Sequence, residues 1–274
     1  PILFIDSSGR IFMVLVGRPS GAKDWDALCR AAVDVLVEEG AKYQPEGKPN
    51  TRRGPHQNVS GGYSFGGGQT RVSNFSHSAH NEEIVKRLCE DPNFRRLAGF
   101  VDASFKLYGR KLHQEYRACM KDLLDRDPGL EPPFRKNVFA ATTFNLGGKV
   151  ATYTHTDHLN YAPGWCAVVA LGNFDSKLGG HLVLWDLNIY VEFPAGSLIL
   201  LPSAILRHSN VAIQEGESRY SFTQYTAGGL FRWRACGFQS QKDFFAKGGK
   251  FPVDGWTRWK QEIEKFTKLE ELGK

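Results

Sequence analysis

The stretch Thr154-His155-Thr156-Asp157-His158-Leu159-Asn160 places two good metal ligands one residue apart. In a β-strand alternate side chains share a face, so we expect His155 and Asp157 to point into one cavity while Thr156 points away. His158 has the opposite parity to His155 and is expected to face away from the metal. The stretch therefore predicts two of the protein ligands of a metal site at a strand end.

A third ligand is expected from a later strand, at His208. Two imidazoles and one carboxylate form the ligand face that holds Fe(II) and leaves neighbouring positions open for a chelating cosubstrate. Arg219 follows 219 − 208 = 11 residues later, one turn and part of the next strand away. Its guanidinium is expected deep in a barrel, where it can pair with the distal carboxylate of 2-oxoglutarate. Ser221 shares its face and can donate a hydroxyl to the same carboxylate.

Each residue also has an ordinary alternative. H-x-D is common by chance, His208 can be a core histidine bonded to backbone, and Arg219 can pair with Glu215 or Glu217 at the surface. A zinc hydrolase on the same three ligands is a further alternative, but it leaves a buried Arg219 without a role. The order of H-x-D, a Gly-Gly turn, a Pro-Ala-Gly turn, His and then Arg favours the iron site.

The pattern from Asn137 onwards changes to short apolar runs at close intervals, which is typical of an antiparallel barrel or jelly roll. We predict an α+β fold with a double-stranded β-helix (jelly-roll) core and flanking helices. The expected strands are Val138–Phe144, Trp165–Leu171, His181–Trp185, Ile189–Phe193, Leu198–Leu201, Ile205–Val211 and Tyr220–Tyr225.

The region before residue 137 is expected to support this core. A hairpin is predicted around residues 6–10, a helix from Trp25 to near Gly40, a helix with Asn81 as its N-cap, and helical periods from about 100 to 124. Residues 44–80 show no regular period, and we expect a functional loop there, with a flexible surface loop as the alternative. A terminal helix is predicted over 255–272. We divide the chain into 1–136 and 137–274, as parts of one integrated domain.

Charge and composition favour an acidic partner in a reducing compartment. Lys and Arg number 35 against 29 for Asp and Glu, and the pI is about 9.0, which favours polyanions such as nucleic acid. The five cysteines form no C-x-x-C pair. No apolar stretch is long enough to cross a bilayer. The chain begins at Pro1 without Met, so we expect an upstream region, where a targeting signal can lie.

The metal motif and the strands around it resemble a known family. His155-x-Asp157, His208 and Arg219-x-Ser221 match the 2-oxoglutarate dioxygenases, and residues 139–233 resemble the TET/JBP branch, fungal TET-like proteins above all. The resemblance implies Fe(II) and 2-oxoglutarate as cofactors and a flipped DNA base as substrate.

Further residue roles follow from the resemblance. It places Asn160 and Tyr225 against the base, where an amide can read a Watson–Crick edge. It also places the segment from Gly237 to Asp243 over the pocket. A turn Asn, a core Tyr and a helix-capping Asp are the ordinary alternatives.

The chain lacks the cysteine-rich zinc module with which animal TET enzymes grip DNA. We therefore expect the 44–80 loop to bind the duplex, with Arg52, Arg53 and Arg71 on phosphates and Tyr63 or Phe65 wedged into the base stack.

The expected reaction is oxidation of 5-methylcytosine to 5-hydroxymethylcytosine and further, and/or demethylation of N6-methyladenine, in the nucleus and by a monomer. The alternatives are a hydroxylase of a protein or small molecule and a non-enzymatic DNA-binding module. The intact ligand set argues against the latter.

Overall fold

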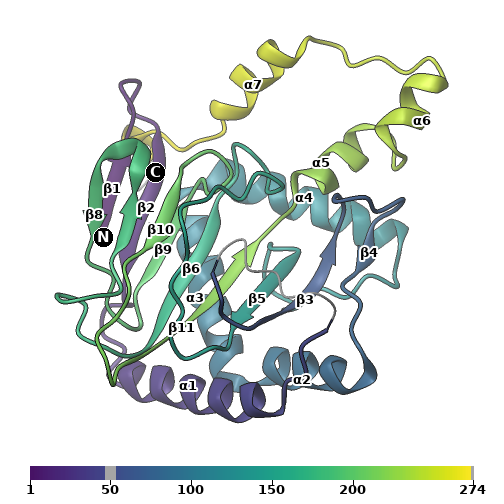
Figure 1. Cartoon of the computed structure of the whole chain (residues 1–274). Helices are drawn as coiled ribbons and strands as arrows, with labels where there is room; N and C mark the ends of the chain where they lie inside the picture. Colours follow the sequence, from purple (N-terminus) through teal and green to yellow (C-terminus); the bar gives the residue numbers. More distant parts are fainter. Residues whose placement is uncertain (47–53, 273–274) are drawn as a thin grey trace.

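Two antiparallel sheets form the centre of the molecule in a computed structural model, which describes residues 1–46 and 54–272 (Figure 1). The major sheet contains, in spatial order, β1 (Ile2–Ile5), β2 (Ile11–Gly17), β9 (Leu198–Leu201), β6 (Cys166–Asn173), β11 (Ser218–Tyr225), β5 (Ala141–Asn145), β3 (Asn58–Ser64) and β4 (Ser73–Asn74). The minor sheet contains β10 (His208–Asn210), β7 (Leu182–Leu184) and β8 (Ile189–Val191).

Helices cover one face of the major sheet, and the minor sheet covers the other (Figure 1). The covering helices are α1 (Trp25–Lys42), α2 (Ala79–Glu90), α3 (Pro92–Tyr108) and α4 (Arg110–Arg126). A second hydrophobic core lies between the sheets and joins residues such as Ile199 of β9 to Leu184 of β7. This arrangement confirms the predicted mixed fold with a double-stranded β-helix core.

Strand β11 shows how the two cores divide. Tyr220 and Phe222 belong to the helix-side core, and the Phe222 ring lies 5.4 Å from that of Phe94 in α3. Because side chains alternate along a strand, Arg219 and Ser221 share the opposite face with Tyr225, which packs against the core between the sheets. The face that carries the candidate cosubstrate residues therefore points into the barrel.

The expectation of an irregular segment over 44–80 is wrong for its middle part, which forms β3 and pairs with β5. Glycines hide the strand pattern in the sequence. A buried strand position such as 61 usually holds a larger residue. Here it is glycine, because a Cβ at Gly61 would lie 2.8 Å from Val85 of α2. The buried positions nevertheless alternate, at Val59, Gly61 and Tyr63.

Helix ends differ from the expected ones at two places. Ser78, not Asn81, caps α2, with its hydroxyl accepting from the Asn81 amide. The Asn81 side chain instead donates to the Gln44 carbonyl at 2.6 Å, which ties the end of the preceding segment to α2. Helix α1 continues past Gly40 to Lys42.

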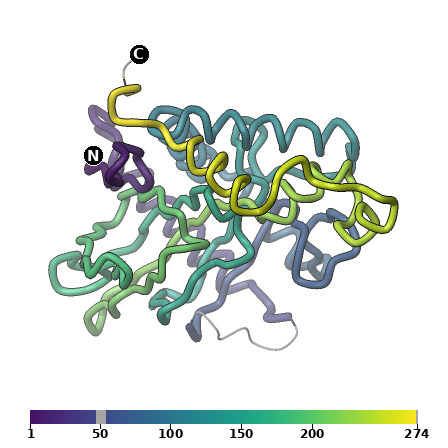
Figure 2. The backbone as a smooth tube through the Cα atoms, turned by 90° about the horizontal axis from the view of Figure 1, so that it is seen from above, coloured from purple at the N-terminus to yellow at the C-terminus, as the bar shows by residue number. Residues whose placement is uncertain are grey.

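The C-terminal part is more divided than the single helix predicted over 255–272. It contains α5 (Gly228–Ala235), α6 (Gln241–Ala246), α7 (Gly255–Ile263) and the short 3-10 turn η2 (Leu269–Glu271). A second 3-10 turn, η1 (Trp185–Leu187), lies earlier, between β7 and β8. After α7 the chain returns to the N-terminal hairpin, where the Ile11 amide donates to the Thr267 carbonyl at 2.9 Å. Figure 2 shows the two ends of the chain on the same side of the molecule. No helix among the described residues is long and apolar enough to cross a membrane.

Candidate metal centre

Three predicted ligands converge between the sheets. One ligand atom from each of His155, Asp157 and His208 lies within 4.8 Å of the other two. The Asp157 carboxylate lies 3.7 Å from Nε2 of His155 and 4.0 Å from Nε2 of His208. Two imidazoles and one carboxylate at this spacing are a suitable donor set for Fe(II).

Backbone bonds, rather than strand alternation, bring the ligands together. His155 and His208 form an isolated antiparallel bridge, with N···O distances of 3.0 and 2.9 Å in the two directions. Asp157 lies just beyond this bridge, where its amide donates to the Ser203 carbonyl at 2.8 Å. The H-x-D stretch is thus not a regular strand, and the bridge to β10 replaces the expected alternation. His158 is exposed, in agreement with its expected orientation.

The two histidines present the same ring nitrogen to the centre. Nδ1 of His155 lies 2.7 Å from the Tyr153 carbonyl, and Nδ1 of His208 lies 2.8 Å from the Leu206 carbonyl. Because a carbonyl only accepts, each Nδ1 carries the proton, and the Nε2 lone pair remains for a metal. The residues present therefore fit a bound divalent ion.

Arg219 lies on the barrel face of β11 and is 1% exposed. Its Nη1 donates to the Val150 carbonyl at 2.8 Å, while its Nε has no partner among the residues that the structure describes. Burial lowers the pKa of Arg219 to about 10, so the group stays charged at neutral pH. A buried cation with an unused donor fits a dicarboxylate such as 2-oxoglutarate.

The surface alternative for Arg219 does not occur. Both carboxylate oxygens of Glu217 accept backbone amides, from Asp175 at 2.7 Å and Gln214 at 2.8 Å. Glu215 is exposed, whereas Arg219 is buried. Arg219 thus has no acidic partner among the described residues.

Glycines allow the backbone and the Phe174 ring to pack closely around Arg219. A Cβ at Gly172, directly across from Arg219 in β6, would lie 2.9 Å from the Arg219 Cα and 2.2 Å from the Ser218 carbonyl oxygen. A Cβ at Gly180 would lie 3.4 Å from the Arg219 Cδ. The wall around the arginine therefore depends on these small residues.

Ser221 has a partner that the sequence did not indicate. Its hydroxyl accepts a 2.8 Å hydrogen bond from the side chain of Asn145 on β5, so its own proton remains for another acceptor. Only the pairing of β5 with β11 brings Asn145 to this position.

Asn160 lies immediately after the metal ligands in space as well as in sequence. Its amide donates to the Asp157 carbonyl at 2.8 Å, and its side chain donates to the Ser203 hydroxyl at 3.2 Å. Asn160 also bridges to Ala227, two residues past Tyr225 at the end of β11. The structure thus brings Asn160 to the end of the strand on which Tyr225 lies.

Tyr225 and Arg219 occupy opposite ends of β11. Six residues of strand separate them, or about 20 Å. Tyr225 is half-buried, and its hydroxyl accepts from Thr143 at 3.2 Å. Arg219 and Ser221 therefore lie towards one end of this barrel face, and Tyr225 and Asn160 lie towards the other.

Other expected site residues lie elsewhere. Gly237 follows α5, and the exposed Asp243 lies in the first turn of α6, where its carboxylate accepts from the capping Ser240 hydroxyl at 2.7 Å. Ser240, and not Asp243, is thus the N-cap of α6, and Asp243 supports it from the first turn. The described contacts of Gly237 and Asp243 are local and do not join them to the metal ligands.

The residues proposed for DNA contact are also separated. Arg71 is exposed, and Arg52 and Arg53 lie outside the described residues. Tyr63 is 1% exposed, with its hydroxyl 3.2 Å from the Met120 sulfur, so it belongs to the core and the expected wedge at this position is wrong. Phe65 is half-buried and lies edge-on to Trp233 at 4.7 Å.

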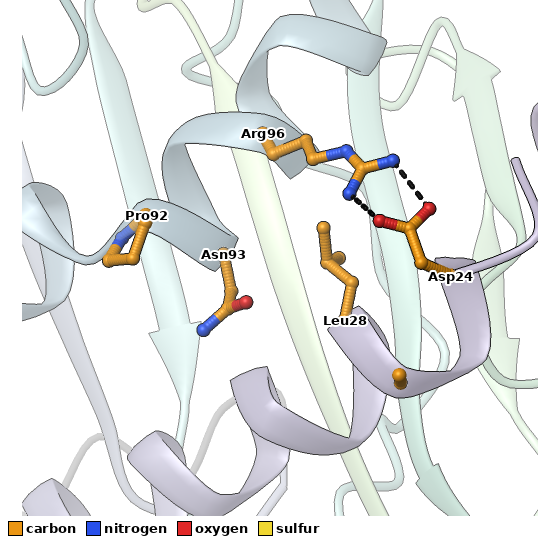
Figure 3. Close-up of a pocket in the computed structure, with 6 residues that line it drawn as sticks. Asp24, Leu28, Pro92, Asn93 and Arg96 are labelled. Carbon is orange, nitrogen blue, oxygen red and sulfur yellow. Dashed lines mark hydrogen bonds and ion pairs between the residues drawn. The ribbon is translucent and has the colours of Figure 1, made fainter.

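A hollow between α1 and α3 is unrelated to this centre (Figure 3). Leu28, Pro92 and Asn93 line it, and an ion pair between Asp24 and Arg96 lies at its edge. It contains none of the candidate metal or cosubstrate residues.

Comparison with known proteins finds a likeness at the level of the fold. No protein-family model and no curated protein matches the sequence. Solved structures similar to this chain include 2-oxoglutarate and Fe(II) oxygenases, and one of them, NgTET1, shares the fold.

The individual likenesses differ in extent. NgTET1 in complex with 5mC DNA superposes with a TM-score of 0.60 at 14% identity, covering 83% of this chain and 77% of that one. A Pseudomonas putida prolyl-4-hydroxylase covers 78% of this chain and 91% of its own at 14% identity, with a TM-score of 0.40. A 2OG-Fe(II) oxygenase family oxidoreductase from Burkholderia pseudomallei covers 80% and 85% at 17% identity, with a TM-score of 0.39.

Proposed function

We propose that this chain is an Fe(II)- and 2-oxoglutarate-dependent dioxygenase that oxidises the methyl group of a modified base in DNA. The observation that carries the proposal is the convergence of His155, Asp157 and His208 inside a barrel whose wall also holds the buried, charged Arg219. A zinc hydrolase would use the same three ligands but would leave this guanidinium without a function.

The proposed roles of these residues, metal binding and cosubstrate binding, follow from their positions. The two histidines and Asp157 would hold Fe(II), and Arg219 with Ser221 would pair with the distal carboxylate of 2-oxoglutarate. When bound, the iron, 2-oxoglutarate and O2 supply the oxidising power for hydroxylation of a C–H bond. The protein itself must orient the methyl group and exclude water.

DNA is the proposed substrate because two residues near the C-terminal end of β11, Asn160 and Tyr225, are suited to contact a base. Asn160 lies beside the ligand Asp157 and can read the edge of an extruded base, and the Tyr225 ring lies on the same barrel face. The net charge of +6 favours a polyanion, and NgTET1, which has a similar fold, was determined with 5mC DNA. Both 5-methylcytosine and N6-methyladenine are candidate bases.

The same proposal includes phosphate contacts by Arg52, Arg53 and Arg71. Such contacts release counterions, so they make binding depend on salt. Each arginine replaced by Ala should reduce the slope of log K against log salt by about 0.9. An unchanged slope in the triple variant would remove these arginines from the proposal.

The substrate class is tested by succinate release. The protein with Fe(II) and 2-oxoglutarate is incubated with duplexes that carry 5-methylcytosine, N6-methyladenine or no methyl group, and separately with a proline-containing peptide. The proposal expects stimulation by a methylated duplex only. Stimulation by the peptide instead would favour a hydroxylase of proteins.

A further inference from the structure

Residues 237–260 are here called the C-terminal arm; beyond Phe238, which packs against the core, the arm projects from the rest of the molecule (Figure 1). The arm contains α6 and the first six residues of α7, and neither helix contains a buried residue. Most helices gain their stability from an apolar face packed on a core. A folded arm that packs so little on its own protein suggests that another surface covers it.

The arm has an ordered interior of its own. The rings of Phe244, Phe245 and Phe251 lie 5.3 to 5.8 Å apart, and the Arg258 guanidinium lies 4.0 Å from the Phe251 centroid. Gly249 permits this cluster, because a Cβ there would lie 2.5 Å from the Phe244 ring. The arm is therefore a shaped element and not an extended tail.

The chain segments on either side of the arm contact the stretch that follows Asp157. On one side α5 starts directly after β11, and the Gly228 amide donates to the Leu159 carbonyl at 2.9 Å. On the other side the Tyr161 hydroxyl donates to the Glu262 carboxylate. Burial, reinforced by Glu262, raises the pKa of Tyr161, so this hydroxyl remains a donor. The arm thus crosses the end of the molecule at which β11 finishes, next to Asn160 (Figure 1).

The arm is basic, and its cations have no acidic partner among the residues that the structure describes. Its 24 residues hold five basic and two acidic side chains, which is a net +3 of the chain's +6. Both acidic groups serve helix starts, since Asp254 caps α7 and Asp243 bonds to the Ser240 cap of α6. The basic residues form no ion pair among the described residues: Lys242, Lys247, Lys250, Arg258 and Lys260.

Large apolar side chains accompany these charges. Trp256 is 63% exposed, with Lys260 lying 5.3 Å from its ring centroid, and Phe245 is 48% exposed. Free cations interleaved with exposed aromatic rings match a ligand that offers both phosphates and flat or apolar sugar and base surfaces.

We propose that the C-terminal arm binds the sugar-phosphate backbone of duplex DNA beside the base held at the metal centre. This inference rests on the proposed function and adds a second contact surface to it. The lysines contact phosphates, and Trp256 packs against the nucleic acid next to them.

The test compares two variants with equal charge change. Lys242→Ala, Lys247→Ala and Lys250→Ala are combined in the arm variant. The control combines Lys23→Ala, Lys86→Ala and Lys106→Ala, which are exposed lysines on or next to α1, α2 and α3. Binding of both full-length proteins to a methylated duplex is measured by fluorescence anisotropy from low to moderate salt.

Three lost phosphate contacts should lower the salt slope by about 2.7 and weaken binding at least tenfold at low salt, whereas the control should bind as wild type does. Trp256→Ala in addition should weaken binding without changing the slope. Equal loss in the arm and control variants, or no loss in either, would overturn the arm proposal.

Two further readouts separate the hypotheses. Anionic phosphatidylserine vesicles are tested in parallel, and an arm-dependent affinity for vesicles without one for DNA would also overturn the proposal. If wild type oxidises methylated DNA and the arm variant binds it equally well, only the arm proposal fails. If DNA binding is arm-dependent but no base is oxidised, the proposed function fails and the arm assignment stands.

Discussion

One hydrogen bond at each histidine determines which ring nitrogen can bind a metal. The carbonyls of Tyr153 and Leu206 hold the protons on Nδ1 of His155 and His208. Sequence reasoning identified the ligands by their spacing but did not identify these carbonyls, since any residue type supplies one. It also missed Asn145 and Ser203, whose positions depend on strand pairing that the chain order does not reveal.

Asp157→Ala should abolish the candidate metal centre, because Asp157 supplies the only carboxylate of the three-residue cluster found among the described residues. We expect Fe(II) affinity to fall by more than about 100-fold, since even indirect partners of metal ligands contribute 10- to 100-fold. Anaerobic isothermal titration with Fe(II) measures this. His158→Ala, which removes the neighbouring exposed imidazole, should leave the affinity unchanged; a large loss there would contradict the ligand assignment.

Arg219→Ala should raise the KM for 2-oxoglutarate roughly 10- to 100-fold, as expected for loss of hydrogen bonds to a charged group. The Kd for DNA should stay nearly unchanged. Arg207→Ala, which removes an exposed arginine paired with Asp186, is the control and should change neither value. Equal losses of 2-oxoglutarate and DNA affinity in Arg219→Ala would count against the cosubstrate role.

At the scale of elements, β11 organises the site. It carries Arg219 and Ser221 near one end and Tyr225 at the other, and the chain leaving it bridges to Asn160. Hydrophobic runs predicted the main strands because their buried residues are β-branched or aliphatic. Strand β3 escaped this prediction, because two of its seven residues are glycines that make room for α2 and for a left-handed turn of the backbone.

Gly172→Ala should disturb the junction of β6 and β11. The backbone φ of 128° and the close Ser218 carbonyl oxygen both oppose a side chain there. We expect a loss of about 1–3 kcal/mol in the free energy of unfolding, together with a higher KM for 2-oxoglutarate.

The matched control for this change is Gly99→Ala in α3. Gly99 is helical, and nothing lies within 4 Å of an added Cβ. It should stabilise the protein by up to about 1 kcal/mol through helix propensity. Thermal melting measures both variants, and a stable Gly172→Ala protein with unchanged KM would contradict the described wall around Arg219.

At the scale of the whole molecule, two sheets and a helical layer place Arg219 and Tyr225 on one face of β11, towards its opposite ends. The jelly-roll class was predictable because short apolar runs separated by turn residues can be recognised in the sequence. The C-terminal arm was not, because its helical periods look like those of a packed terminal helix. Only the structure shows that α6 and α7 bury no residue.

The central claim, oxidation of a DNA methyl group at the His-Asp-His centre, is tested most directly by nucleoside mass spectrometry. Methylated duplex DNA is incubated with the protein, Fe(II) and 2-oxoglutarate, digested, and compared with a parallel reaction of Asp157→Ala. The account predicts oxidised or demethylated nucleosides in step with succinate, and none from the variant. An unaltered methylated nucleoside from the active, metal-loaded protein would contradict it.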